Sequence, residues 1–252
     1  LERVLVENGY EVRYHGSGST GAVAGRPGGI GGQAGSAGGD SSMNESLRDA
    51  DAYVIINPSA RYDNAEAASV SAFADAGGRV LIMSDPSSLS IAELLAQALG
   101  ATTGGSTDAL TPVSSQFGVG VGSGYLYDMT EYDSNYQTIY ASGTGSSLSE
   151  DVDRVSVDRA APVFTSPDAT VALTSSANTE LSDSGTAREY AVAARNQNVS
   201  IVGDTSILAP ARLQHADNEV FVGNLIEFLV GGTVQPDAFT LTGPDSQPSE
   251  QS

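Results

Sequence analysis

The sequence predicts an α/β fold with parallel strands, because residues 51–85 have the pattern of a strand, a helix and a second strand. Residues 52–56 (AYVII) and 79–83 (RVLIM) are short apolar runs rich in β-branched residues, as expected of strands buried on both faces. Between them, from Asp63 onward, apolar residues recur with a helical period, and Gly77-Gly78 supplies the residue at positive φ where helices often end. Such a unit joins parallel strands through a right-handed crossover.

The segments before this unit are predicted to be shorter and less regular. Residues 1–8 favour a helix, residues 10–14 alternate like a strand, and residues 42–48 suit one or two helical turns. Residues 16–41 consist largely of glycine, serine and alanine, and they lack the lysine that a phosphate-binding loop requires. We therefore predict a flexible surface insertion there.

The middle of the chain is predicted to be rich in short strands. A helix is expected over residues 91–99, and a polar loop over residues 101–108. A β-rich elaboration of the fold then spans residues 113–174, built of hairpins or an added sheet. Its expected strands lie within residues 116–127, 137–141, 151–157, 162–165 and 170–174.

The last part of the domain returns to a regular pattern. Residues 190–194 and 199–203 are predicted to form a pair of strands. A final helix is expected to begin at Asp217 or Asn218, which serves as its N-cap. We assign residues 1–232 to one α/β domain.

Residues 233–252 are polar and contain proline, so we predict a tail or linker there. The chain starts at Leu1 in what resembles the middle of a first βα unit, so we expect it to be a fragment or a processed form. Any signal or membrane anchor would then lie outside it. No run in residues 1–252 reaches the roughly 18 apolar residues of a membrane helix, so we expect no membrane span within the chain.

The composition excludes several classes of function. The formal net charge of −20 arises from 31 acidic residues against 11 basic residues, and every basic residue is arginine. This excess repels phosphate groups and argues against nucleic acid as a partner. An acidic surface is also a device of halophile proteins, although an acidic mesophile protein is an alternative. Because cysteine is absent, disulfides, thiolate nucleophiles and cysteine metal ligands are excluded.

Three passages together resemble an uncharacterised haloarchaeal family that carries a domain of unknown function. The resemblance covers most of residues 1–232 and implies a three-layer α/β sandwich with a mostly parallel sheet, similar to class I glutamine amidotransferase-like and flavodoxin-like folds. It also implies similarity to auxiliary domains of ABC-type export and gliding machinery, and hence a membrane-anchored archaeal protein outside the cytoplasm with transporter subunits as partners. The passages are NPSARYDNAEAASVSAFADAGGRVLIMSDP (57–86), FGVGVGSGYLYDMTEYDSNYQTIYA (117–141) and YAVAARNQNVSIVGDTSILAPARLQHADNEVFVGNLIEFLVGG (190–232).

The chain departs from the active amidotransferases that this resemblance suggests. Those enzymes place a cysteine on a tight turn between a strand and a helix, with His and Glu as partners. Here the turn after residues 79–83 carries Asp85-Pro86, and no cysteine occurs anywhere in the chain. Glutamine hydrolysis by that route is excluded, and we assign no catalytic residue, cofactor or metal ligand.

Polar residues that follow three predicted strands form the candidate ligand crevice. In an open α/β sheet, ligands bind beyond the carboxyl ends of the strands. Two carboxylates at such a crevice can bind a cation or act as an acid/base pair, but aspartate and serine at these positions also serve as helix caps. The candidate residues are Asn57, Ser59, Asp85, Ser87, Asp204, Thr205, His215 and Asp217.

His215 is the candidate general base or metal ligand of this group. Together with Asp204 and Asp217 it forms the most plausible local constellation for such a role. We prefer the interpretation of His215 as a histidine in a solvent-exposed loop.

Two Asn-x-Ser triplets, at Asn44 and Asn198, fit the N-glycosylation pattern. Such triplets indicate glycosylation only if the chain is extracytoplasmic. Because Asn198 falls in a tight turn between two predicted strands, we expect it to be exposed enough for modification.

The sequence leaves three functions open. We favour a non-catalytic, extracytoplasmic binding or scaffold domain of a halophile membrane-associated assembly, accessory to an ABC-type transporter, because the amidotransferase nucleophile is missing. The second function is a hydrolase that uses Asp85 and Asp204 with water or a cation. The third is a small-molecule or sugar-binding domain that uses the same crevice.

Overall fold

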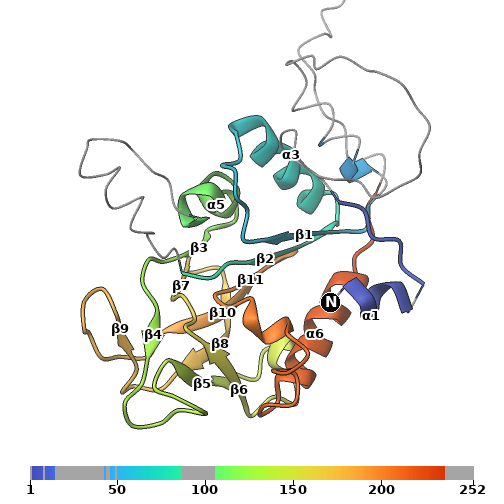
Figure 1. Ribbon diagram of the computed structural model, residues 1–252. Coiled ribbons are helices and arrows are strands. Elements are labelled where there is room, and N and C mark those ends of the chain that lie inside the picture. The colour runs from blue at the N-terminus through green and yellow to red at the C-terminus, as the bar shows by residue number, and fades with distance from the viewer. Residues whose placement is uncertain are drawn as a thin grey trace, which may run out of the picture.

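A computed structural model shows the arrangement of the chain (Figure 1). It describes residues 2–7, 9–14, 43, 46–48, 50–86 and 106–235. The insertion predicted at residues 16–41 and the helix predicted over residues 91–99 lie outside the described residues, as does the tail from residue 236 onward.

The described residues form a seven-stranded mixed sheet in the order β1-β2-β11-β10-β8-β5-β6. The strands β1, β2 and β11 run parallel to one another, whereas each neighbouring pair from β11 to β6 is antiparallel. In that order, the strands are Ala52–Ile56, Arg79–Met83, Val199–Val202, Ala191–Asn196, Thr170–Ser175, Thr138–Gly143 and Arg154–Asp158.

The predicted three-layer sandwich with a mostly parallel sheet is wrong. Within the seven-stranded sheet two strand pairings are parallel and four are antiparallel, and the described part of the chain contains few helices. The reason is that β5, β6 and β8, which lie in the predicted elaboration, join the main sheet. In addition, β10 and β11 are connected through only two residues, Gln197 and Asn198, and so short a connection forces antiparallel pairing.

The predicted parallel unit between residues 51 and 85 is confirmed. Helix α3 (Asn64–Asp75) connects β1 to β2, whose register pairs Ala52 with Arg79. Asp63 caps the helix by accepting hydrogen bonds from the backbone N–H groups of Ala65 and Glu66, both at 2.8 Å. Gly77 ends it at a φ of 103°, where a Cβ would lie 2.3 Å from the Thr233 carbonyl oxygen.

Side chains that alternate along β2 pack into two separate apolar cores. Val80 and Ile82 belong to the core that contains α3, whereas Leu81 and Met83 belong to the core that contains α6. Helices α3 and α5 (Ser106–Ser114) therefore cover one face of the parallel strands, and α6 (Asn218–Val230) covers the other (Figure 1). None of the described helices has the length and apolar character that a membrane crossing requires.

Several shorter elements differ from the predictions. Helix α5 begins at Ser106, inside the predicted polar loop, and residues 10–14 form no strand. Two small pairs of strands, β3 with β7 and β4 with β9, stand beside the main sheet. The remaining elements are α1 (Glu2–Glu7), β3 (Val119–Val121), β4 (Leu126–Tyr127), β7 (Val163–Thr165), β9 (Glu180–Leu181), and the 3₁₀ helices η1 (Ser115–Phe117), η2 (Ser147–Ser149) and η3 (Ser206–Leu208).

Two side chains at the start of α6 bind the outer edge of β6. The side-chain amide of Asn218 accepts from the Ser156 backbone N–H at 2.7 Å and donates to the Ser156 carbonyl at 2.9 Å. Asp217 accepts from the backbone N–H groups of Asp153 and Arg154 at 3.0 and 3.1 Å. Asp217 is the N-cap residue, as predicted, but its side chain does not cap the helix.

Candidate functional site

The carboxyl ends of the three parallel strands meet at a hydrogen-bonded cluster of Asn57, Asp85 and Thr205. One oxygen of Asp85 accepts from the Thr205 backbone N–H at 2.7 Å. Its other oxygen accepts from the Thr205 hydroxyl at 2.6 Å and from the Asn57 amide nitrogen at 2.7 Å. Asp85 therefore links residues that follow β1 and β11 to the end of β2.

Both the backbone conformation and the side chain of Asn57 suit this position. Its φ is 42°, in the left-handed region that asparagine tolerates better than most residues. In this conformation the Asn57 side-chain oxygen accepts from the Asp85 backbone N–H at 2.8 Å, while its nitrogen donates to the Asp85 carboxylate. The predicted crevice residues Asn57, Asp85 and Thr205 thus contact one another.

Asp204 lies next to this cluster and is fully buried. It accepts hydrogen bonds from the Ser206 backbone N–H at 2.7 Å, the Ser206 hydroxyl at 2.9 Å and the Asp158 backbone N–H at 3.1 Å. Burial raises the pKa of Asp204 to about 6, with a further contribution from the Asp85 charge, although the hydrogen bonds from Ser206 and Asp158 oppose the rise. The Asp85 carboxylate is therefore close enough to act on the protonation of Asp204.

His215 does not join Asp204 and Asp217 in the predicted constellation. Its Nδ1 lies 2.6 Å from a carboxylate oxygen of Asp133, and that same oxygen accepts from the Ser156 hydroxyl at 2.8 Å. Asp217 instead binds the edge of β6. In the part of the chain that the structure describes, no group of three or more His, Asp or Glu side chains could hold a metal ion.

The remaining predicted positions lie apart from the strand-end cluster. Ser59 is exposed in the loop after β1, while Ser87 and Asn44 lie outside the described residues. Asn198 is half-buried rather than exposed. Its amide nitrogen donates to the Ala74 carbonyl at 2.8 Å, and its oxygen accepts from Arg79, so glycosylation would require breaking the bond to Ala74.

A second acidic centre lies at the base of the loop between β4 and β5, where the sequence favours a solvated acidic face of Asp128, Glu131 and Asp133 over a Ca²⁺ site. Asp128 is buried and accepts five hydrogen bonds, from the Thr130 backbone and hydroxyl, the Glu131 backbone, and the hydroxyls of Ser176 and Thr179. Burial acts to raise the pKa of Asp128, but these hydrogen bonds outweigh it and lower the pKa to about 2. The local signal was Asp128 followed by Thr130, which is typical of a side-chain-stabilised turn.

Strand β4, the residue before it and the loop after it carry large side chains that are partly or largely exposed to solvent. We name Tyr125, Tyr127, Met129, Tyr132 and Tyr136 the tyrosine surface. The ring of Tyr127 contacts those of Tyr125 and Tyr136, with centroids 6.3 and 6.2 Å apart. Met129, Tyr132 and Tyr136 are 64%, 45% and 43% exposed.

A polar hollow of about 500 Å³ lies elsewhere, beside the turn between β10 and β11. This turn is at the amino end of β11, whereas Asp204 and Thr205 follow its carboxyl end. The hollow therefore contains none of the predicted crevice residues. It is lined by Ser146, Ser147, Asp168, Thr170, Arg195, Asn196 and Gln197.

A family model for a domain of unknown function, DUF4350, matches residues 38–226 of the chain. The chain belongs to the DUF4350 family. A similar solved structure is the "mmIFT52 N-terminal domain", with a TM-score of 0.56 and 13% identity over 76% of this chain and 82% of that one. At this identity the likeness shows the fold alone. No curated protein matches the chain.

The geometry of this DUF4350 domain limits the chemistry of its strand ends. The Asp85 carboxylate is occupied by internal donors, and Asp204 is closed off from solvent. His215, whose side chain is 38% exposed, is oriented by Asp133 and lies in a different hydrogen-bonded group. The strand ends therefore serve as a structural junction, while the tyrosine surface offers contact area to other molecules.

Proposed function

We propose that this DUF4350 domain is a non-catalytic binding or scaffold domain of a membrane-associated assembly outside the cytoplasm. The observation that carries the proposal is the state of Asp85, whose two oxygens accept three hydrogen bonds from Asn57 and Thr205. An ionised carboxylate has about four acceptor positions, so little capacity remains for a substrate or a water molecule. Asp85 instead links the carboxyl ends of three strands.

The finer parts of the proposal rest on the resemblance of the three sequence passages and on the charge. A net charge of −20 supports a halophile origin, because it keeps a protein soluble where salt screens repulsion. The resemblance to auxiliary domains of ABC-type export and gliding machinery supports an archaeal transporter as the assembly. A membrane anchor in a segment outside the chain would place the domain beside it.

A hydrolase is the second candidate, and one observation favours it. Asp204, with a pKa raised to about 6, lies near Asp85, and two carboxylates with different environments can divide the roles of acid and base. The complete burial of Asp204 opposes this function because a substrate cannot reach it. Turnover of ester, phosphate or glycoside model substrates that disappears in a folded Asp204→Asn variant would establish the hydrolase.

The proposed function is tested by capturing the tagged full-length gene product from cross-linked source membranes in high salt. We expect mass spectrometry to find subunits of one transporter enriched with it. The control is an equally tagged soluble protein of similar negative charge, which removes partners attracted by charge alone. Recovery of the tagged protein without transporter subunits would overturn the proposed assembly.

A further inference from the structure

We propose that the tyrosine surface binds an arginine-rich segment of a partner protein. The inference rests on the proposed binding function and adds the chemistry of the partner. It depends on four properties of the loop between β4 and β5 and of its neighbour β9: exposed rings, a fixed backbone, local negative charge, and arginine–tyrosine stacking already present in the fold.

The first property is a concentration of exposed aromatic side chains. Five of the ten tyrosines in the chain fall between residues 125 and 140. Tyr132 and Tyr136 are nearly half exposed, and Met129 of the same loop is 64% exposed. Tyrosine is enriched in protein interfaces because it offers a large apolar ring with a polar end.

The second property is that the loop is held in place before any partner arrives. Asp128 fixes its start through five hydrogen bonds, three of which come from Thr130 and Glu131 in the loop. Asp133 fixes the centre of the loop through hydrogen bonds with His215 and Ser156, which lie far from it in the sequence. A surface fixed in this way loses less conformational entropy on binding.

The third property is the local charge. Residues 128–137 and 180–187, which include the loop and β9, carry five acidic residues, and the fold places the Arg154 guanidinium 4.0 Å from one of them, Glu131. Strand β9 pairs with β4, and the Tyr127 hydroxyl donates to Glu180 at 2.7 Å, so the two segments lie side by side. A cationic partner fits this charge, whereas a second copy of the chain would bring another net charge of −20.

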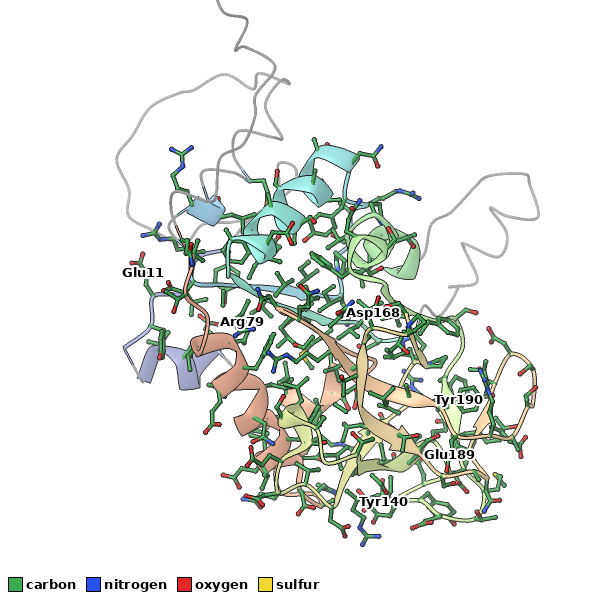
Figure 2. The ribbon with its side chains drawn as sticks, turned by 180° about the vertical axis from the view of Figure 1, so that it is seen from behind. Glu11, Arg79, Tyr140, Asp168, Glu189 and Tyr190 are labelled. Atoms are coloured by element: carbon green, nitrogen blue, oxygen red, sulfur yellow. The ribbon has the colours of Figure 1, made fainter. Side chains whose placement is uncertain are left out.

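The fourth property shows why arginine fits better than lysine. Within this fold the Arg154 guanidinium lies 4.2 Å from the centre of the Tyr140 ring, and that of Arg188 lies 4.5 Å from the Tyr190 ring. Figure 2 places Tyr140 at the end of the molecule farthest from α3. A planar guanidinium stacks on an aromatic ring more favourably than an ammonium group. The partly exposed rings of Tyr132 and Tyr136 offer the same contact to an incoming arginine.

The test measures the binding of fluorescein-labelled hexa-arginine by fluorescence anisotropy. Salt at about 1 M shortens the screening length to about 3 Å and suppresses attraction by distant charge. We expect the double variant Tyr132→Ser/Tyr136→Ser to bind about tenfold more weakly than the unchanged chain. Hexalysine should bind the unchanged chain more weakly than hexa-arginine does.

The matched control is Phe164→Ser, which removes an aromatic side chain that is 55% exposed outside the tyrosine surface. This variant should bind hexa-arginine as tightly as the unchanged chain. Equal binding by the double variant and the unchanged chain would overturn the inference, as would equal weakening in the control.

Ring-labelled tyrosine NMR provides a second readout that needs no variant. Addition of hexa-arginine should shift the signals of Tyr125, Tyr127, Tyr132 and Tyr136 and leave those of Tyr53 and Tyr62 unchanged. Shifts spread over all tyrosines would contradict a local site. If peptide binding is local but no transporter is captured from membranes, the inference stands and the proposed assembly falls.

Discussion

Asp128 and Asp204 are both buried aspartates, yet their surroundings move their pKa values in opposite directions. Asp128 accepts five hydrogen bonds, and its pKa falls to about 2. Asp204 accepts three hydrogen bonds and lies near the Asp85 charge, and its pKa rises to about 6. Three differences account for the opposite shifts: Asp204 is enclosed much more deeply by protein than Asp128, accepts fewer hydrogen bonds and lies near the Asp85 charge.

This contrast distinguishes two uses of an acidic side chain. The charge on Asp128 stabilises the folded state because it holds the loop between β4 and β5, whereas the charge on Asp204 costs stability at neutral pH. A raised pKa therefore identifies a destabilised group without identifying a catalyst. Three predictions test this comparison.

The largest effect is expected from Asp128→Ala. This change leaves five donors without their acceptor, so the free energy of unfolding at pH 7 should fall by about 3 kcal/mol or more. Urea denaturation measures the loss. The control Asp168→Ala removes an exposed carboxylate and should change stability by less than about 0.5 kcal/mol. Equal losses in both variants would refute the role assigned to Asp128.

The second effect is an opposite dependence on pH. The folded-state pKa of Asp204, about 6, exceeds the unfolded value of about 3.9, so its contribution to stability improves by up to about 3 kcal/mol as pH falls from 7 to 4. The folded-state pKa of Asp128 is about 2, below that of the unfolded chain, so about 2–3 kcal/mol is lost as pH falls from 4 to 2.

Urea denaturation across these pH ranges compares the unchanged chain with two variants. Asp204→Asn should lack the gain between pH 7 and 4, and Asp128→Asn should lack the additional loss below pH 4. Parallel curves for all three proteins would show that neither carboxylate has the assigned environment.

The smallest effect is expected from Asp85→Asn. The asparagine oxygen still accepts from the Thr205 backbone, but its amide nitrogen faces donors, so stability should fall by about 1–2 kcal/mol. Removing the Asp85 charge should also lower the pKa of Asp204, which carboxyl NMR measures. An unchanged Asp204 pKa would mean that burial alone sets it.

Local sequence patterns predicted those parts of the fold whose contacts are close in sequence. The unit around α3 and the β10–β11 pair follow from burial periods and turns within short stretches. The prediction of a mostly parallel sheet was wrong because β8 pairs antiparallel with both β5 and β10. No local sequence pattern specifies which strands become neighbours. Helix α5 was missed because Pro112 lies inside it.

The candidate site, like the fold, was predictable only in part. The cluster of Asn57, Asp85 and Thr205 was predictable, because the carboxyl ends of parallel strands meet at one edge. The partner of His215 was not, because Asp133 lies 82 residues away and comes from the loop between β4 and β5. Only the folded chain brings those two side chains together.

The contact of Asn218 with Ser156 has a consequence for solubility. A sheet edge with free N–H and C=O groups is a template on which further chains can polymerise. Because Asn218 and Asp217 occupy these groups along β6, an incoming chain finds no ladder there to extend. Charge repulsion between copies fades as salt concentration rises, but the bonds from the neutral Asn218 amide to Ser156 do not depend on charge and continue to oppose fibre growth at high salt.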